Sequence, residues 1–299
     1  MTYNVEASEN YIEPLDADSV ELSEYRGLIY YQPVVLSHRC FVFIGTYYHT
    51  KEKKYLDRAE KYARKLMSEC HIVDGAAYVP YTVWFAVHGD SSVLLIPPWY
   101  SAMAQGELLE VVVRLYELTD DPDYLEFSHM LFRSFLRLRG TSDPWVVRID
   151  DDGYYWFEEY PHDTKPGMTL NGFIAGLFGV YDYYQITHSE SAKLVWELSL
   201  TTLKHYLPDY RRPGQTGYYC LGHRHPATEY YHGFHSTLCE RLYKLSGDPF
   251  FQQMAAEFRL DSGDANSALD RQHFDRSIPL LRYSGVTAED RSRGCPDGR

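Results

Sequence analysis

Three short segments of the chain gather side chains that can move protons or hold a sugar: WFEEYP at 156–161, TGYYCLGHRH at 216–225 and EYYHGFHSTL at 229–238. They supply carboxylates, phenols and imidazoles, which proteins use as general acids and bases. Tyrosine rings also pack against the faces of pyranose rings. Taken alone, each segment is also compatible with an exposed turn or with simple packing, so its meaning depends on the elements that position it.

The sequence contains few features of a metal-binding or cofactor-binding protein. The pairs His223 and His225, and His232 and His235, have spacings that a metal ion tolerates, but no carboxylate or third imidazole lies at ligand spacing. The five cysteines are scattered and odd in number, without a CxxC pair, which predicts reduced and mostly buried thiols. A GxSxG elbow, a P-loop and a dinucleotide fingerprint are all absent from the sequence. The sequence therefore predicts no metal site and no cofactor.

The charge and the hydropathy pattern exclude two classes of partner. The formal net charge is −13, which argues against nucleic acid and against an anionic membrane surface. No run of about 18 apolar residues occurs, and the acidic N-terminal sequence has neither a basic nor an apolar leader region. We therefore expect a cytoplasmic protein that stays in the compartment where it is made.

One local pattern recurs four times along the chain: an aromatic-rich helix, a short polar turn and a second amphipathic helix. Aligning the copies on Thr50, Thr119, Thr187 and Ser246 gives separations of 69, 68 and 59 residues. Asp and Pro after the turn supply an N-cap and a first-turn proline for the second helix. The repeat predicts four helical hairpins that must stack to bury their apolar stripes, one of which runs from Leu108 to Leu118.

The expected fold is mainly α, an incomplete (α/α) toroid of helical hairpins with small β-hairpin inserts that form the active-site rim. Inserts are predicted where 146–149 and 154–157 flank an Asp-Asp-Gly turn, and around RPGQTGYYCL. The predicted division is an N-terminal extension over 1–25, a catalytic domain over 26–260 and a loosely ordered tail over 261–299.

Several segments together resemble the C-terminal catalytic domain of D-glucuronyl C5-epimerases. The matching stretches follow family order from Pro97 to Leu245 and comprise PPWYSAMAQGELLEVVVRLYELT, WFEEYP followed by TLNGFIAGLFGVYD, TGYYCL and YYHGFHSTL. The first two are specific strings and the last two are weaker. The resemblance implies an enzyme that removes the C5 proton of D-glucuronate within a heparosan- or heparan-like polysaccharide and returns a proton to the opposite face, giving L-iduronate.

The resemblance also implies roles for individual residues. It assigns Glu159 and Tyr231 as opposed acid and base groups, and Tyr160 and Tyr219 as groups that hold and polarise the substrate. The implied substrate-binding residues are Tyr100, Gln105, Asn171, Arg224, His232 and His235. The implied partner is an anionic, glucuronate-containing polysaccharide, and a homodimer is compatible with the sequence.

One departure from the family lies in TGYYCL. In the family, an arginine three residues after the tyrosine of this segment meets the uronate carboxylate. This chain has Gly222 at that position, so Arg224 or His223 is expected to replace the arginine. Three other readings stay open. A polysaccharide lyase forms the same carbanion and then cuts the chain, a glycoside hydrolase pairs Glu159 with a carboxylate such as Asp182, and a glycan-binding module uses only the aromatic groove.

Overall fold

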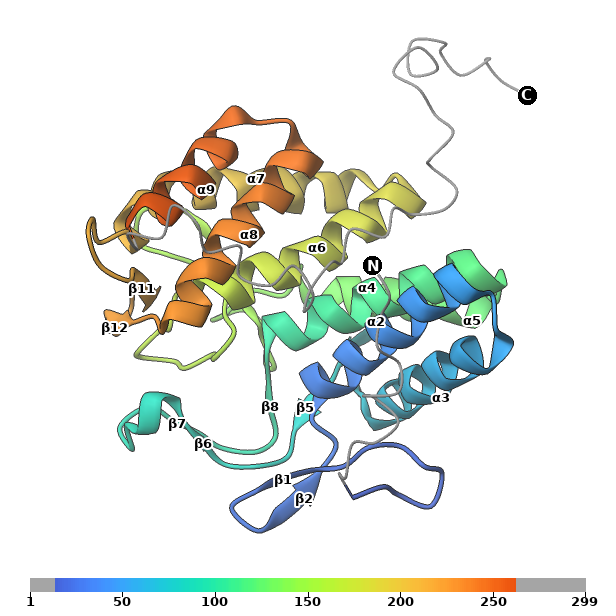
Figure 1. Cartoon of the computed structure of the whole chain (residues 1–299). Helices are drawn as coiled ribbons and strands as arrows, with labels where there is room; N and C mark the ends of the chain where they lie inside the picture. Colours follow the sequence, from blue (N-terminus) through green and yellow to red (C-terminus); the bar gives the residue numbers. More distant parts are fainter. Residues whose placement is uncertain (1–13, 262–299) are drawn as a thin grey trace.

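The computed structural model of the chain describes residues 14–261 (Figure 1), and within this part eight α-helices form four hairpins. The pairs are α2 (Pro33–Thr50) with α3 (Lys53–Glu69), α4 (Ala102–Thr119) with α5 (Pro122–Ser134), α6 (Leu170–Thr187) with α7 (Glu190–Tyr206), and α8 (Glu229–Ser246) with α9 (Pro249–Asp261). The four hairpins predicted from the repeat are confirmed.

The first helices of the hairpins form an inner row. α2 packs against α4, α4 against α6 and α6 against α8, while each second helix packs chiefly on its own partner (Figure 1). Inner and outer helices therefore alternate along the chain, and four pairs do not close a full ring. The fold is an incomplete (α/α) toroid, as the sequence predicts.

All four hairpin turns use the same hydrogen bonds. The hydroxyl of the last inner-helix residue donates to the carbonyl four residues earlier and accepts the N–H two residues later, at Thr50, Thr119, Thr187 and Ser246. The next residue caps the helix in the left-handed region, with φ between 53° and 71°, at Lys51, Asp120, His188 and Gly247. This shared chemistry explains why the repeat is visible in the sequence.

The central helices α4 and α6 touch through their backbones. A Cβ on Gly179 would lie 1.9 Å from the carbonyl oxygen of Gly106, and one on Gly106 would lie 2.1 Å from that of Gly176. Only glycine allows this approach. Because α4 is enclosed by α2, α3, α5 and α6, it is buried on nearly every side. The prediction of one buried stripe on this helix was therefore too narrow.

Short antiparallel hairpins interrupt the helices. They pair β1 (Ser23–Tyr25) with β2 (Leu28–Tyr30), β3 (His71–Val73) with β4 (Ala76–Tyr78), β5 (Pro80–Tyr81) with β8 (Trp99–Tyr100), β6 (Phe85–Ala86) with β7 (Leu94–Leu95), β9 (Val147–Ile149) with β10 (Tyr155–Phe157), and β11 (Tyr218–Cys220) with β12 (His225–Pro226). Two 3-10 turns, η1 (Val87–Gly89) and η2 (Leu207–Tyr210), complete the elements.

The insert at 146–157 forms as predicted, but four strand pairs were missed: β1 with β2, β3 with β4, β5 with β8, and β6 with β7. β3 and β4 join through Asp74 and Gly75, both at positive φ, which is the signature of a two-residue hairpin turn. Arg26 and Gly27 make the same turn between β1 and β2. The hairpin near TGYYCL pairs Tyr218 with Pro226, so it lies on the C-terminal side of the predicted one.

Part of the predicted N-terminal extension packs onto the helices. Val20 is fully buried and Glu21 forms an ion pair with Arg39 of α2. Residues 1–13 of that extension and all but the first residue of the predicted tail lie outside the described residues. Between residues 14 and 261, no helix combines the length and hydropathy that crossing a membrane requires.

Candidate active site

A cleft of about 260 Å³ opens where the inner helices begin. Its walls include Gln32, the N-cap of α2, and Ser101, the N-cap of α4. They also include Asn171 and Tyr231, from the first turns of α6 and α8. Four helix N-termini therefore face one hollow, which we call the catalytic cleft. Such ends carry partial positive charge, so the arrangement favours an anionic ligand.

A second cleft of about 340 Å³ adjoins the first. Both are lined by Tyr25, Phe85, Tyr160 and Tyr231, and the second, here the outer cleft, is also lined by Arg26. Together the two hollows have room for more than one sugar ring. Arg26 is the sole Arg or Lys side chain among the described residues that line either of them.

Glu159 has the environment of a proton-transfer group. It is 7% exposed in the catalytic cleft, and its Oε2 is buried without a hydrogen-bond partner. Burial, reinforced by the nearby Glu107 carboxylate, raises the pKa of Glu159 to about 7, against the opposing hydrogen bonds from Tyr160 and Tyr219. The side chain lies against Gly172 in the first turn of α6, where an added Cβ would stand 2.1 Å from Oε2. Gly172 thus makes room for the carboxylate.

The neighbouring Glu158 is structural. Its Oε1 accepts from Arg148 Nε at 2.6 Å and its Oε2 accepts from the N–H groups of Gly167 and Met168, both at 3.1 Å. It is fully buried and lines neither cleft. The sequence places two carboxylates side by side, and the structure satisfies one while leaving the other for chemistry.

The three tyrosines of the predicted site lie next to Glu159. The Tyr219 hydroxyl donates to Glu159 Oε1 at 3.4 Å and lies 3.4 Å from the Tyr160 hydroxyl. The Tyr231 ring meets the Tyr219 ring edge-on, with centroids 4.8 Å apart. Burial raises the pKa of all three phenols, and the Glu159 charge raises each further. They are therefore protonated, and able to donate, at neutral pH.

Aromatic rings form one wall of the catalytic cleft. Tyr81 stacks on Trp99 with centroids 4.0 Å apart, and Phe85 stacks on Tyr160 at 5.3 Å. Flat apolar faces beside polar groups suit a pyranose ring. Asn171, which the resemblance implies binds substrate, lines the same cleft, with its Oδ1 buried and without a hydrogen-bond partner.

Two predicted binding residues instead hold the scaffold. Gln105 is fully buried and its amide bonds to Val79 N, Ala77 O and Ser134 Oγ. Tyr100 is packed against Tyr78, and its hydroxyl bonds to His71 Nδ1 at 2.7 Å. Neither Gln105 nor Tyr100 lines a cleft, so both are left out of the site that we propose.

The two predicted histidines are also interior. His232 accepts from Gly217 N at Nδ1 and donates to Phe258 O from Nε2, which ties α8 to α9. His235 is fully buried against the Phe258 ring, and burial lowers the pKa of its imidazole to about 3. Both lie outside the two clefts, because their helix turns them toward α9.

The predicted replacement for the family arginine does not reach the substrate space. Gly222 lies against backbone, since an added Cβ would stand 1.9 Å from Pro166 O, so no side chain fits there. Arg224 and His223 line neither cleft. Arg26 lines the outer cleft and is the one arginine among the described residues that lines either cleft. No local sequence pattern marks Arg26 beyond the Arg-Gly turn, because only folding brings it to the cleft that Tyr160 also lines.

A glycoside hydrolase needs two carboxylates in its active site, and the described residues place only one in these clefts. Asp182 is buried between helices, where its Oδ2 forms an ion pair with Arg114 Nη2 at 2.9 Å. Within residues 14–261, Glu159 is the one Asp or Glu that lines either cleft. What the arrangement supports is proton transfer: a carboxylate that is half ionised near pH 7 beside protonated phenols, in a hollow that attracts anions.

Comparison with known proteins identifies a family for this chain. Residues 74–260 match the family described as D-glucuronyl C5-epimerase C-terminus. An uncharacterised protein of Methanocaldococcus jannaschii is 28% identical over 162 residues, 54% of this chain and 52% of that one. The D-glucuronyl C5-epimerase of Caenorhabditis elegans is 33% identical over 131 residues, 39% of this chain and 20% of that one. This chain therefore spans about half of one curated relative and a fifth of the other.

Among solved structures, the cellobiose 2-epimerase of Bacillus thermoamylovorans B4167 is similar in fold. The TM-score is 0.51 at 13% identity, over 77% of this chain and 60% of that one. At this identity the likeness concerns the fold alone.

Proposed function

Because this chain belongs to the D-glucuronyl C5-epimerase family, we propose that it inverts C5 of D-glucuronate residues within an anionic polysaccharide. The observation that carries the proposal is Glu159, a buried carboxylate with a pKa of about 7 in a cleft that it shares with Tyr231. A base near neutrality and a protonated phenol are the pair that removal and return of a carbon-bound proton needs.

In the proposed reaction, ionised Glu159 takes the C5 proton, and the electron pair moves into the substrate carboxylate to give an enediolate-like intermediate. Tyr231 then donates its hydroxyl proton to C5 from the other face, which inverts the centre. The reverse reaction uses the same groups in opposite roles. The Tyr219 hydroxyl, 3.4 Å from Glu159 Oε1, stabilises negative charge that builds up nearby.

Neutralising the substrate carboxylate is the other requirement, because its negative charge opposes ionisation at C5. The N-termini of the inner helices that line the catalytic cleft supply part of this stabilisation, and α4 and α6 begin without a side-chain cap. We assign the remaining part to Arg26 at the outer cleft. Both sources are local, so they act despite the net charge of −13.

The test is to incubate the protein with unsulfated and N-sulfated glucuronate polymers in D₂O, following deuterium at C5 by NMR and chain length by gel filtration. We expect deuterium at C5 in chains of unchanged length. Shortened chains with unsaturated ends would replace the epimerase proposal by a lyase. A polymer that binds without exchange would replace it by a glycan-binding module.

Substitutions in the catalytic cleft test whether its residues carry out the C5 proton exchange. Tyr231→Phe and Glu159→Gln each remove a proton-transfer group with little change in volume, so each should lower the exchange rate at least about 100-fold. The matched controls are Tyr243→Phe, on the same helix but outside both clefts, and Glu126→Gln, an exposed residue of α5. Full exchange in Glu159→Gln would remove Glu159 from the mechanism.

A further inference from the structure

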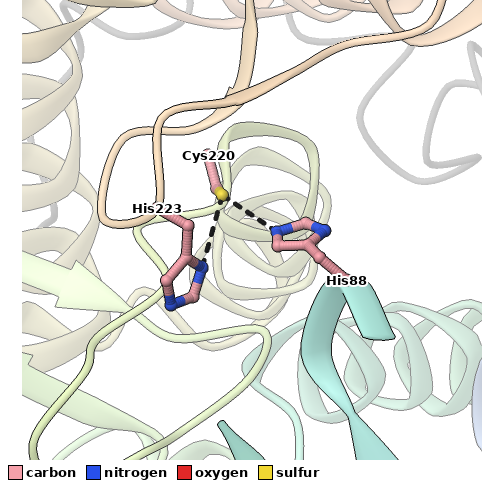
Figure 2. Close-up of side chains that lie close together, drawn as sticks. All are labelled: His88, Cys220 and His223. Carbon is pink, nitrogen blue, oxygen red and sulfur yellow. Dashed lines mark hydrogen bonds between the residues drawn. The ribbon is translucent and has the colours of Figure 1, made fainter. Parts of the chain in front are cut away.

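Three ligand-type side chains that the proposed reaction does not use converge beside the outer cleft. His88 Nε2 lies 3.1 Å from Cys220 Sγ, and Cys220 Sγ lies 3.6 Å from His223 Nδ1 (Figure 2). All three atoms lie within 4.8 Å of one another. His88 and Cys220 are 132 residues apart in sequence, so only the fold brings them together.

Cys220 and His223 come from one rigid turn. Cys220 ends β11, and the backbone beyond it is fixed because Leu221 N donates to Met168 O and Gly222 N to Gly167 O. The bond from Arg224 N to Leu221 O closes a tight turn, which aims the side chains of Cys220 and His223 at each other. A Cys-x-x-His spacing in a fixed turn is common in zinc sites.

His88 comes from a different insert. It lies in η1, at the end of the β6 and β7 hairpin, with φ at 54°. A histidine in the left-handed region costs free energy that the surrounding structure must offset, and such residues concentrate at functional positions. This backbone conformation directs Nε2 of His88 to the Cys220 sulfur (Figure 2).

We propose that His88, Cys220 and His223 bind one Zn²⁺ ion, with water as the fourth ligand. In a tetrahedral zinc site the sulfur and nitrogen ligand atoms are about 3.6 Å apart and two nitrogens about 3.3 Å, by the usual bond lengths. The distance from Cys220 Sγ to His223 Nδ1, 3.6 Å, matches this value, and the distance to His88 Nε2, 3.1 Å, is shorter. Binding therefore needs the His88 ring to move back slightly from the sulfur and the two imidazoles, now within 4.8 Å, to draw closer. One thiolate and two imidazoles are the ligands that zinc prefers over calcium or magnesium.

Hydrogen bonding alone explains the cluster less well. It would need the thiol to donate to one imidazole and its sulfur, a weak acceptor, to accept an N–H from the other. A nucleophilic cysteine is also a poor explanation, because burial raises the pKa of the Cys220 thiol.

The ion would join two inserts that together form the rim of the outer cleft. His88 lines that cleft, and Tyr219 of the proposed catalytic group precedes Cys220 in β11. The His88 ring also contacts the Tyr219 ring edge-on at 5.6 Å. Zinc would therefore fix the β6 and β7 hairpin against β11 and β12. Because His88 is exposed, solvent can reach the fourth position.

The test uses the full chain, stripped of metal with a chelator and titrated with Co²⁺ and then with Zn²⁺. We expect one equivalent of Co²⁺ to bind with a thiolate-to-cobalt charge-transfer band, and Zn²⁺ to displace it and raise the melting temperature. Cys220→Ser should remove the band. His88→Asn should weaken binding by more than the roughly 10- to 100-fold that loss of an outer-shell partner costs. Asn also tolerates the left-handed backbone at this exposed position.

Cys70→Ser is the matched control, since Cys70 lies in another part of the fold and bonds to Leu66 O within its own helix turn. It should keep the band and the affinity. Circular dichroism checks that each variant is folded. Absence of a charge-transfer band in the folded wild-type chain, or a band that survives Cys220→Ser, would overturn the proposal. These readouts do not depend on the epimerase reaction, so the two proposals fail separately.

Discussion

At the scale of single residues, adjacent Glu158 and Glu159 acquire opposite roles from their surroundings. Glu158 accepts hydrogen bonds from Arg148 and from two backbone N–H groups, which stabilise its ionised form against the burial that raises its pKa. Glu159 accepts a long hydrogen bond from Tyr219 and has an oxygen without a partner, and burial raises its pKa to about 7. Glu158 and Glu159 are the same residue type, and only their contacts with α6 and β9 give them different environments.

The raised pKa of Glu159 predicts a pH dependence. The proposed base must be ionised, so kcat/KM should rise as the pH increases through about 7 and then level off, since the phenols stay protonated. The measurement is the initial rate of C5 deuterium incorporation between pH 4 and pH 9. A limb near pH 4.5, the ordinary value for a glutamate, would show that Glu159 is not the group that limits the rate.

Because Arg26 lines the outer cleft and Arg224 does not, we expect their substitutions to affect the kinetics differently. Arg26→Ala should lower kcat/KM about fivefold, with part of the loss in kcat, because an exposed charge contributes roughly 1 kcal/mol and Arg26 is proposed to neutralise the carboxylate whose charge opposes ionisation at C5. Arg224→Ala, which removes an exposed arginine outside both clefts, should change neither value. Steady-state kinetics on both variants checks this. The opposite pattern would return the role to Arg224, where the family comparison first placed it.

At the scale of elements, α4 and α6 are locked by glycine. Gly179→Ala places a Cβ 1.9 Å from a backbone oxygen of α4, which cannot move aside, so we expect a loss of at least about 3 kcal/mol in the free energy of unfolding. Denaturant unfolding followed by circular dichroism measures this loss.

Gly247→Ala is the control for the same added methyl group. Nothing lies within 4 Å of its Cβ position, and only the positive φ of 71° opposes the change. The expected cost is about 1 kcal/mol. Equal losses in the two variants would mean that backbone strain, rather than helix contact, explains the glycine at 179.

At the scale of the whole molecule, the helical hairpins were easier to predict from the sequence than the residues that the fold brings together at the site. The four hairpins were predictable because one turn chemistry repeats at Thr50, Thr119, Thr187 and Ser246. Glu159 and its tyrosines were predicted from a resemblance in short strings. Arg26 and His88 were missed as site residues, since their neighbours lie far along the chain and no local pattern encodes that distance.

The net charge predicts an unusual salt effect. A chain of charge −13 repels a polyanion at long range, and the positive cleft acts only nearby. Raising the ionic strength from about 10 mM to about 100 mM shortens the screening length from roughly 30 Å to 10 Å, so KM should fall. Exchange rates at several substrate concentrations measure this. A KM that rises steadily over the same range would show that local attraction dominates instead.

The hairpin turns have a practical consequence for attaching the molecule to a surface. Each inner helix starts at the catalytic cleft and ends at a turn, and its 18 residues place that turn roughly 27 Å from the cleft. A linker at the exposed Lys51 would therefore leave the cleft mouth facing outward. An immobilised catalyst of this kind could accept a polymer from solution without the support obstructing its entry.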